Sequence, residues 1–508
     1  MTAVADETTA TEVRRSTRSG AIGLVGAAVN GAFGFVLTIV VVRAFGADGS
    51  GALFSAIGLV SIVGAVCCLG ADTALIWALP RRRSGPDGNA ARLLLPALVP
   101  PVGLALLVAA IGLMTAGPIA RALLDDADGA ALIRLAFAGV PMIVAVTVLL
   151  AAVRATRAVS AYVAVQFLFV PIARPALMIA AVAAGGGVLA GFGGWLLPLT
   201  LALLIALALV IRPFGIGAGA SLRPAVTDWR PFWGFALPRA ASVAIDASSM
   251  WVGVLLTGAL ATQAETGVFA AVGRYALAGL LVMQGVRVAI APQLSRLLGA
   301  GRRPEAARIY RSTSLGIVLL SWPAYLMLGV FAPAFLALFG ADFRSGATPM
   351  AVLAAAMGVN VGLGLVQTVL LMSGNSRGHL IATVSGLTLN VGLCLVLIPR
   401  HGALGAAIAW SAGIVCENVL AAVLARRALG EALFGRTLVV SALAVTAATG
   451  AAAATGVLVA GRGLTGLAVA LAIVAVGAAA LLADRRVRAA LASVRHQLRP
   501  SGHSKEEQ

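Results

Sequence analysis

Apolar stretches long enough to cross a lipid bilayer recur along the whole chain, and they constrain its fold more than any other feature. A membrane-spanning helix needs about 20 apolar residues, and the sequence offers roughly fourteen such stretches joined by short polar turns. Hydrophobic residues make up 60% of the chain and charged residues 11%, with a mean hydropathy of +1.00. Because backbone polar groups inside a bilayer must bond to one another, the sequence predicts an all-α polytopic membrane protein.

The apolar stretches group as six, six and two, with no room for a soluble domain between them. The predicted parts are a cytoplasmic tail at 1–19, an N-lobe of six spans at 20–211, a cytoplasmic connector at 212–232, a C-lobe of six spans at 233–425, two further spans at 437–483 and a second cytoplasmic tail at 484–508. The ninth span is expected at 313–338.

The formal net charge of +18 is spread unevenly over the connections between the spans. The two tails and every second connection together hold 27 basic residues. The alternate connections hold only Arg43, Arg121, Arg344, Arg400 and Arg462. Since basic loops stay in the cytoplasm, this pattern predicts that both termini are cytoplasmic, and it explains the excess charge without nucleic acid as a partner. The arginine- and alanine-rich composition is typical of a GC-rich bacterial genome, so we expect the bacterial cytoplasmic (inner) membrane.

Four ionisable residues lie inside two adjacent apolar segments that together run from Trp233 to Leu298. They are Arg239, Asp246, Arg274 and Arg287. An ionised side chain at the centre of a membrane helix costs about 2.5–3.5 kcal/mol, so each of them must face protein, water or a charged ligand. By the helical rise, Arg239 and Arg287 come out near the cytoplasmic face, where their long side chains can reach the interface.

A further intramembrane arginine lies in the run VPIARP, where Pro171 and Pro175 flank Arg174. Each proline removes a helical hydrogen bond and bends the segment. With about 1.5 Å of rise per residue, Arg274, Arg174 and Asp246 lie roughly 10, 14 and 18 Å from the outer ends of their helices, which is a similar depth. The alternative is that Arg174 pairs with a neighbouring helix for structural reasons.

The two halves of the chain align with each other at a shift of 216 residues. This shift lays Gly51 on Gly267, Asn30 on Asp246 and Arg174 on Asn390. An even number of spans per half keeps both halves in the same orientation, so the repeat is predicted to be parallel, with a binding site between the halves near the membrane midplane. The alternative is that glycine-rich turns match one another by chance.

Several motifs in this order are similar to one family. They are FGADGSGALFSAIGLV with LGADTALIWALPR, then APQLSRLLGAGR, LFGADFRSGA, MSGNSRGHL and LIPRHGALGAAIAW. They resemble the polysaccharide flippases (lipid-linked oligosaccharide, O-antigen type) of the multidrug/oligosaccharidyl-lipid/polysaccharide exporter superfamily. The resemblance implies two six-helix lobes around a central cavity. It also implies transport of an undecaprenyl-pyrophosphate-linked oligosaccharide from the inner to the outer leaflet by alternating access.

The chain departs from one branch of that superfamily. Lipid II flippases carry cavity-lining arginines in their first two helices, whereas the corresponding stretches VNGAFGFVLTIVV and SIVGAVCC have none. The arginine that this branch places early in the eighth helix has a counterpart in Arg274, within VGRYA. The departure argues against lipid II and favours an O-antigen, capsule or other surface-polysaccharide precursor.

The predicted site centres on Arg274, because the planar guanidinium suits phosphate oxygens. We expect Arg274 to contact the pyrophosphate with Arg174 assisting, and Asp246 to be their charge partner or an ion site. The secondary candidates are Arg239, Asn30 and Asn390. No catalytic residue, metal or cofactor is expected. The expected partners are the lipid-linked glycan and membrane lipids, with a polysaccharide polymerase and glycosyltransferases as candidate protein partners.

Two other functions stay open at this point. A cation-coupled, multidrug-type small-molecule antiporter of the same fold could use Asp246 as its ion site, with Asp72 or Glu417 assisting. A membrane glycosyltransferase or polymerase could use the run Asp125, Asp126, Asp128, which can hold a metal. No histidine falls inside a predicted span to act as an acid or base, which argues against an enzyme. The four cysteines lie in apolar spans without disulfide or zinc spacing and are expected to pack.

Overall fold

A computed structural model describes residues 2–83, 90–124, 129–156, 159–211, 214 and 226–483, and within these ranges it contains helices and turns but no strand. The all-α fold predicted from the sequence is therefore confirmed. Among the described residues, 9 helices are long and apolar enough to cross a membrane, or up to 10 if one bent pair counts as a single span. Two of these helices, α1 and α16, each hold two apolar runs separated by a glycine, so the helices follow the predicted order of spans.

Half of the fourteen predicted spans are each a single unbroken helix. These helices are α3 (Leu94–Met114), α5 (Ala130–Thr156), α8 (Val188–Ile211), α9 (Val226–Leu260), α12 (Arg303–Val330), α17 (Arg436–Ala460) and α18 (Leu464–Ala483). Helix α18 is apolar but shorter than the nine membrane-length helices. The short pieces η1 (Ala90–Leu93), α4 (Ala116–Leu124), α13 (Ala332–Leu336) and η3 (Ala341–Gly346) lie between them.

Several other spans are broken at positions where the sequence places glycine or proline. In α1 (Thr2–Cys67) and α16 (Ser376–Leu429) the backbone leaves helical geometry at Gly46, with φ 65°, and at Gly402, with φ 48°. Such positive φ angles favour glycine because it has no Cβ. The second run of α1 continues into α2 (Ala71–Arg83), α10 (Gln263–Ala278) into α11 (Leu280–Gly299), and α14 (Ala347–Gly362) into α15 (Val366–Met372) after a bend of 41°.

The sequence predicted a break at Pro171 and Pro175, but the fifth span is one continuous helical run whose geometry changes in the turn before Pro171. It consists of α6 (Val159–Val163), a π-helical turn η2 (Ala164–Phe169) and α7 (Val170–Ala183). Pro171 stands in the first turn of α7 and has no N–H to donate, and the turn directly before it is π-helical.

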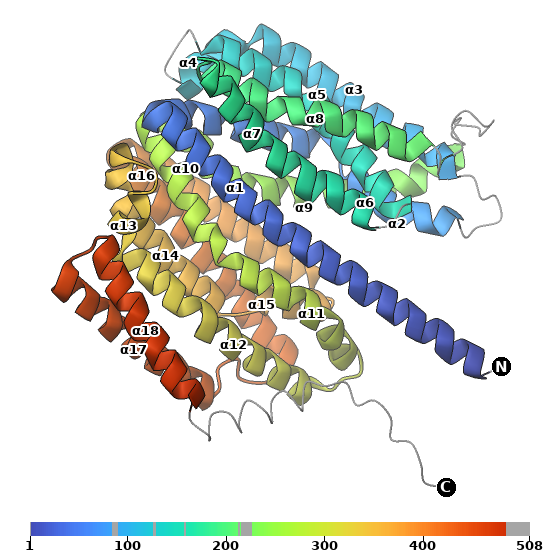
Figure 1. Cartoon of the computed structure of the whole chain (residues 1–508). Coiled ribbons are helices and arrows are strands. Elements are labelled where there is room, and N and C mark those ends of the chain that lie inside the picture. The colour runs from blue at the N-terminus through green and yellow to red at the C-terminus, as the bar shows by residue number, and fades with distance from the viewer. Residues whose placement is uncertain are drawn as a thin grey trace.

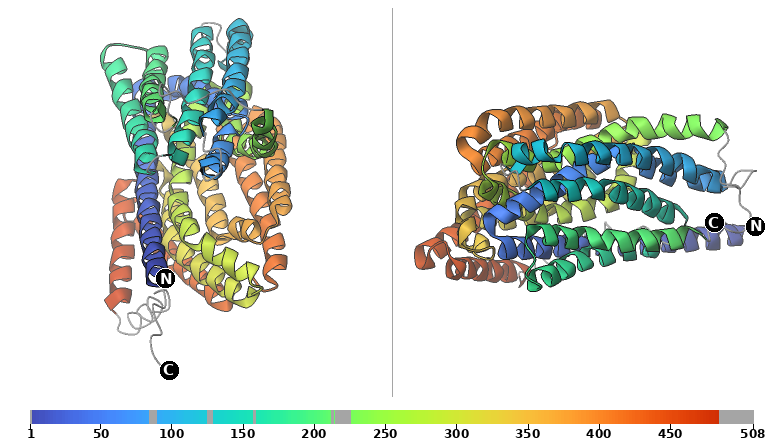
Figure 2. Two further views of the ribbon diagram at one scale, coloured as in Figure 1. Left: turned by 90° about the vertical axis from the view of Figure 1, so that its right-hand side faces the viewer. Right: turned by 90° about the horizontal axis from the view of Figure 1, so that it is seen from above.

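The helices form two lobes, the N-lobe (α1–α8) and the C-lobe (α9–α16). In Figure 1, α3, α5, α7 and α8 lie above the long helix α1, and α12, α14 and α15 lie below it. The left view in Figure 2 shows the same division. Helices α17 and α18 lie against the C-lobe, where Ala452, Ala453 and Leu467 pack with Met327 and Phe331 of the neighbouring segment. The largest apolar core extends across both lobes, so the lobes share a packed interface in this conformation.

Two glycines bring the lobes into close contact. A Cβ built on Gly51 of α1 would overlap the carbonyl oxygen of Gln263 in α10, and a Cβ on Gly267 of α10 would overlap that of Ala47 in α1. The two contacts are equivalent in the internal repeat, because at the shift of 216 residues Gly51 corresponds to Gly267 and Ala47 corresponds to Gln263. This reciprocity supports the internal repeat and shows why small residues are needed at this helix crossing.

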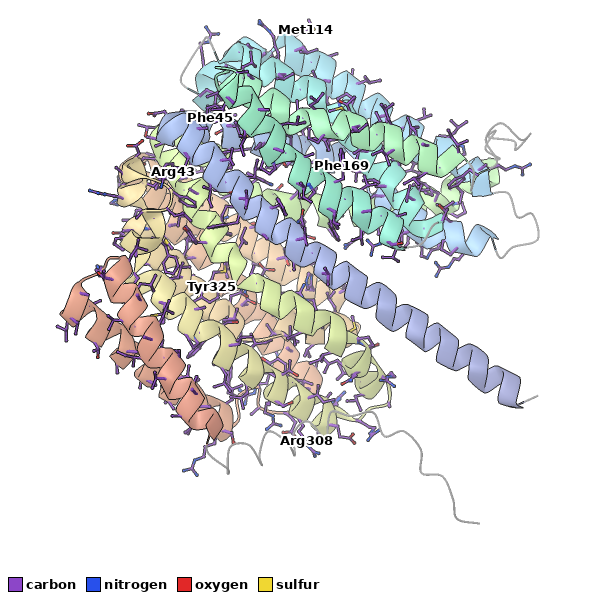
Figure 3. All side chains as sticks on the ribbon, in the orientation of Figure 1. Arg43, Phe45, Met114, Phe169, Arg308 and Tyr325 are labelled. Carbon is purple, nitrogen blue, oxygen red and sulfur yellow. The ribbon has the colours of Figure 1, made fainter. Side chains whose placement is uncertain are left out.

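The lobes also meet through hydrogen bonds near these glycines, at the end of the bundle that holds the turns at Gly46, Gly340 and Gly402, here called the turn end. Arg43 donates from Nε to the Leu338 carbonyl at 2.8 Å and from an η nitrogen to that of Ala337 at 3.2 Å. Gln263 donates to the Leu123 carbonyl at 2.8 Å. In Figure 3, Arg43 and Phe45 lie at the left of the molecule, far from Arg308 at the opposite, arginine-rich basic end.

The helices differ from the predicted spans at some boundaries. Helix α1 begins at Thr2, so residues 2–19, which the sequence assigns to a cytoplasmic tail, are helical and continue into the first span. Their location outside the membrane stays a prediction. The ninth span is α12 at Arg303–Val330 rather than 313–338, because Pro304 and Glu305 start the helix before its apolar part begins. Asp125, Asp126, Asp128, the tail at 484–508 and most of the connector at 212–232 lie outside the described residues.

Candidate functional site

Helix α10 positions Arg274, the central residue of the predicted site. Thr262 caps the helix by accepting a hydrogen bond from the Glu265 backbone N–H at 3.3 Å. Three turns further on, Arg274 faces α9, and its Cζ lies 5.3 Å from the centroid of the Trp251 ring. An arginine stacked on an indole in this way gains cation–π stabilisation while its polar edges stay free to bind a ligand.

Arg274 lines a pocket with an empty volume of about 350 Å³, here called the aromatic pocket. Its other residues are Met250, Trp251, Val254, Phe269, Ala270, Gly273, Leu277 and Trp410. They come from α9, α10 and the second half of α16, so the pocket belongs to the C-lobe. Of these lining residues Arg274 alone is charged.

The guanidinium of Arg274 has no acidic partner in the described part of the chain. The ion pairs found there within 4.0 Å are Arg302–Glu305 and Arg311–Glu431, and no hydrogen bond is made by the Arg274 side chain. None of its nitrogen atoms is among the fully enclosed, unbonded ones, so they face open space. A half-buried arginine of this kind keeps its capacity to bind an anion.

Asp246 lies on α9, five residues before Trp251, and is exposed. At about 1.5 Å per residue it stands about 7.5 Å closer to the basic end than Trp251. The charged groups near enough to act on its carboxylate are Arg239 and His379. The described residues therefore include no ion pair between Asp246 and Arg274 or Arg174 in this conformation, and a joint site of all three stays a prediction.

Arg174 lies in a different place from Arg274, within the N-lobe. Its Cζ stands 3.9 Å from the centroid of the Trp195 ring, and its Nε donates to the Trp195 carbonyl at 3.3 Å. Both contacts join α7 to α8. These contacts match the structural alternative considered for Arg174, and its assistance in binding stays a prediction.

The secondary candidates are scattered. Asn30 is exposed on α1, and Arg239 is exposed on α9. Asn390 is buried on α16, where its Oδ1 accepts a hydrogen bond from the Cys394 thiol at 3.4 Å. Arg287 on α11 is half-buried and its Nε is enclosed without a hydrogen bond in the described structure. That its side chain reaches the interface stays a prediction.

The carboxylates of the ion-coupled alternative are also separate from one another. Glu417 accepts hydrogen bonds at 2.9 Å from both Gln367 and Thr383, inside the C-lobe. Asp72 lies on α2 of the N-lobe, with an enclosed Oδ1 that has no hydrogen-bond partner in the described structure. Among the described residues no group of three His, Cys, Asp or Glu is placed to hold a metal ion.

The sequence reasoning missed the aromatic residues of the pocket. Trp410 ends the motif LGAAIAW that carried the family resemblance, and Trp251 follows the polar run Ser248, Ser249 in a span that already contained Asp246. Both signals were present, but only the fold brings the two indoles together beside Arg274.

Comparison with known proteins supports a transporter fold. No family model matches the sequence. A segment of 178 residues is 26% identical to the probable low-salt glycan biosynthesis flippase of Haloferax volcanii. The aligned segment makes up 34% of this chain and 36% of that protein. The match thus spans about a third of the length of that relative.

Two solved structures are similar over most of their length. The lipid II flippase MurJ in an inward closed conformation gives a TM-score of 0.68 at 11% identity, covering 90% of this chain and 99% of that one. An inward-facing multidrug resistance transporter of the MATE family gives a TM-score of 0.62 at 16% identity, and the match covers 79% of this chain and 94% of that one. The chain therefore has the fold of the transporters of the multidrug/oligosaccharidyl-lipid/polysaccharide exporter superfamily, as its motifs predicted.

Proposed function

We propose that the protein is a flippase that moves an undecaprenyl-pyrophosphate-linked oligosaccharide, a precursor of a surface polysaccharide, across the bacterial cytoplasmic membrane by alternating access. The observation that carries this proposal is Arg274, which lines a pocket in the C-lobe without an acidic partner among the described residues. An arginine that binds no carboxylate leaves its donors to a phosphate group, and its planar fork can hold two phosphate oxygens at once. The partial match to a glycan biosynthesis flippase agrees with this substrate class.

Alternating access requires two conformations that bind the substrate differently. In the present one the turn end is held by Arg43, Gln263 and the two crossing glycines. The two neighbours described above are in inward closed and inward-facing conformations. With the basic end in the cytoplasm, as the arginine distribution predicts, the protein would here be closed toward the outside. Substrate binding at Arg274 would then favour release of the turn-end contacts.

A cation-coupled antiporter of small molecules is the second candidate. Glu417 favours it, because its carboxylate accepts hydrogen bonds from the Gln367 amide and the Thr383 hydroxyl and so forms a polar cluster with them inside the C-lobe. Arg274 opposes it, since a cationic drug in the aromatic pocket would meet an unpaired positive charge. The similar proteins found by comparison are flippases and transporters, which gives the enzyme alternative no support.

The test is transport by purified protein in liposomes that contain a fluorescent undecaprenyl-pyrophosphate-linked oligosaccharide. Arg274→Ala should lower the flipping rate roughly a hundredfold or more, because a charge that is lost at a phosphate contact costs several kcal/mol. Arg274→Lys should recover only part of the rate, since a single ammonium cannot form the bidentate contact. Arg308→Ala, which removes an exposed arginine at the basic end, is the matched control and should transport normally.

Normal transport by a folded Arg274→Ala protein would contradict the role of Arg274. Failure of the parent protein to move any lipid-linked oligosaccharide, together with ion-dependent efflux of a cationic dye, would favour the antiporter.

A further inference from the structure

The aromatic pocket combines one cation with a surface of aromatic rings. The Phe269 and Trp410 rings meet edge to face with centroids 6.1 Å apart, and Trp251 stacks beneath Arg274. Trp251 and Trp410 are only half-buried, so part of each indole is open. Since no carboxylate or imidazole is among the described lining residues, a complementary occupant has an anionic group next to a part that packs on aromatic faces.

The repeat shows that this combination is particular to the C-lobe. At the shift of 216 residues, Arg274 corresponds to Gly58 and Trp251 corresponds to Phe35. Gly58 packs against Trp251 itself, since a Cβ built on this glycine would lie 3.1 Å from the indole Cε3. The N-lobe thus has a glycine where the C-lobe has its cation, and the substrate-facing chemistry of the two halves differs.

We propose that the aromatic pocket binds the first sugar ring of the lipid-linked glycan together with the phosphate attached to it. This proposal rests on the function proposed above. The guanidinium of Arg274 takes the phosphate, and the indole of Trp410 packs against the C–H face of the pyranose. The C–H bonds on one face of a pyranose form an apolar surface with a weak positive potential, which complements the negative face of an aromatic ring. The sugar hydroxyls stay at the rim, where they keep their hydrogen bonds to water.

The aromatic pocket is open on one side, and its volume of about 350 Å³ includes open space outside its walls. A ring packed on the open face of Trp410 would therefore be only partly enclosed, and the rest of an oligosaccharide would extend into water. The pocket would then distinguish the loaded carrier from undecaprenyl pyrophosphate without a sugar, so that the protein transports cargo rather than the empty carrier.

The experiment measures equilibrium binding of two probes to the full-length protein in lipid nanodiscs by native mass spectrometry. The probes are undecaprenyl pyrophosphate and undecaprenyl-pyrophosphoryl-N-acetylglucosamine, which share lipid and phosphates and differ by one pyranose. The parent protein should bind the glycosylated probe about tenfold more tightly, as expected for one ring stacked on an indole.

Variants of Trp410 test the sugar contact separately from the phosphate contact. Trp410→Leu should remove the tenfold preference and leave the affinity for undecaprenyl pyrophosphate unchanged, whereas Trp410→Phe should keep most of the preference because it keeps an aromatic face. Arg274→Ala should weaken binding of both probes by the same factor. Trp322→Leu is the matched control, since Trp322 lies in the same lobe, donates from Nε1 to the Gly358 carbonyl at 2.8 Å and does not line the pocket. Thermal unfolding in the nanodisc verifies that each variant is folded.

The outcomes separate the two proposals. Equal affinity of the parent protein for both probes, or an unchanged preference in folded Trp410→Leu, would overturn the sugar site while leaving the flippase proposal in place. If the parent protein binds neither probe, both proposals are overturned. The sugar site is supported if the preference for the glycosylated probe disappears in Trp410→Leu and in none of the other variants.

Discussion

At the scale of single residues, two intramembrane arginines of similar predicted depth have opposite surroundings. Arg174 stacks on Trp195 and donates to its carbonyl inside the N-lobe. Arg274 also lies over an indole, that of Trp251, but its nitrogen atoms make no hydrogen bond within the described structure and face a pocket. The residue type alone therefore does not identify a binding site. What distinguishes the two arginines is whether the polar edge of the guanidinium is already occupied by the protein.

Glu265 shows how a local capping pattern is used over a long distance. Thr262 and Glu265 have the spacing of a capping box, in which the glutamate would return to the backbone of the threonine. Here the Glu265 carboxylate instead accepts a hydrogen bond at 2.9 Å from the Ala403 N–H, beside the helix break at Gly402. One side chain thereby connects the start of α10 with the turn in α16.

This contact predicts a measurable coupling between two positions. Glu265→Ala should destabilise the protein by about 1–3 kcal/mol, because it leaves the Ala403 N–H without its acceptor. Gly402→Ala should destabilise it as well, because φ is positive there and the new Cβ would overlap the Glu265 carboxylate. In the double variant the overlap is absent, so the loss should be smaller than the sum of the two single losses. Thermal unfolding in detergent measures all three.

Gly463→Ala is the control for this cycle, because Gly463 also lies in a turn but a Cβ there would meet nothing within 4 Å. It should leave the unfolding temperature unchanged. Strict additivity of Glu265→Ala and Gly402→Ala would contradict a direct contact between the two sites.

At the scale of the elements, the helices follow one another up and down through the membrane. The breaks in α1 and α16 matter for this order, because each turns one continuous run of helix into two spans. Among the described residues, the arginine-rich connections at 299–303 and 426–436 then lie at the basic end, and the turns near Arg43, Arg344 and Arg400 lie at the turn end. By the positive-inside rule we expect the basic end to be the cytoplasmic one.

Labelling of single cysteines tests this orientation. In a variant without the four native cysteines, cysteines at Asp342 and Arg462, both exposed, should react with a membrane-impermeant maleimide added to intact cells. A cysteine at the exposed Arg302 should react only after the membrane has been permeabilised. Reaction at 302 in intact cells would reverse the orientation.

At the scale of the whole molecule, the two lobes are joined at the turn end by contacts that a rocking motion would have to break. The reciprocal approach of Gly51 and Gly267 depends on the absence of side chains, and Arg43 bonds only to carbonyl groups of the other lobe among the described residues. Neither contact involves a buried ion pair, so separation leaves no unpaired buried charge behind.

Crosslinking of this end should stop transport. Arg43 and Leu338 are exposed, and cysteines at both positions can be joined by a short bifunctional thiosulfonate reagent. The crosslinked protein should lose flipping in liposomes and regain it after reduction. The same treatment of cysteines at Leu458 and Leu464, which belong to the single hairpin of α17 and α18, should leave transport unchanged. Full activity of the crosslinked 43–338 protein would show that this end does not open during transport.

The sequence by itself determined the fold class, the order of the spans and the turns at Gly46 and Gly402. Apolar length decides whether a segment spans a bilayer, and glycine and proline leave local marks at Gly46, Gly402 and Pro171 because their backbone restrictions act within a few residues. It also identified Arg274, since a charge inside an apolar span is visible without any neighbours. Only the tertiary structure decided which residues surround these positions. The separation of Arg174 from Arg274 and the pocket formed by Trp251 and Trp410 depend on how helices distant in the chain pack, and such packing is not encoded in the periodicity of any one segment.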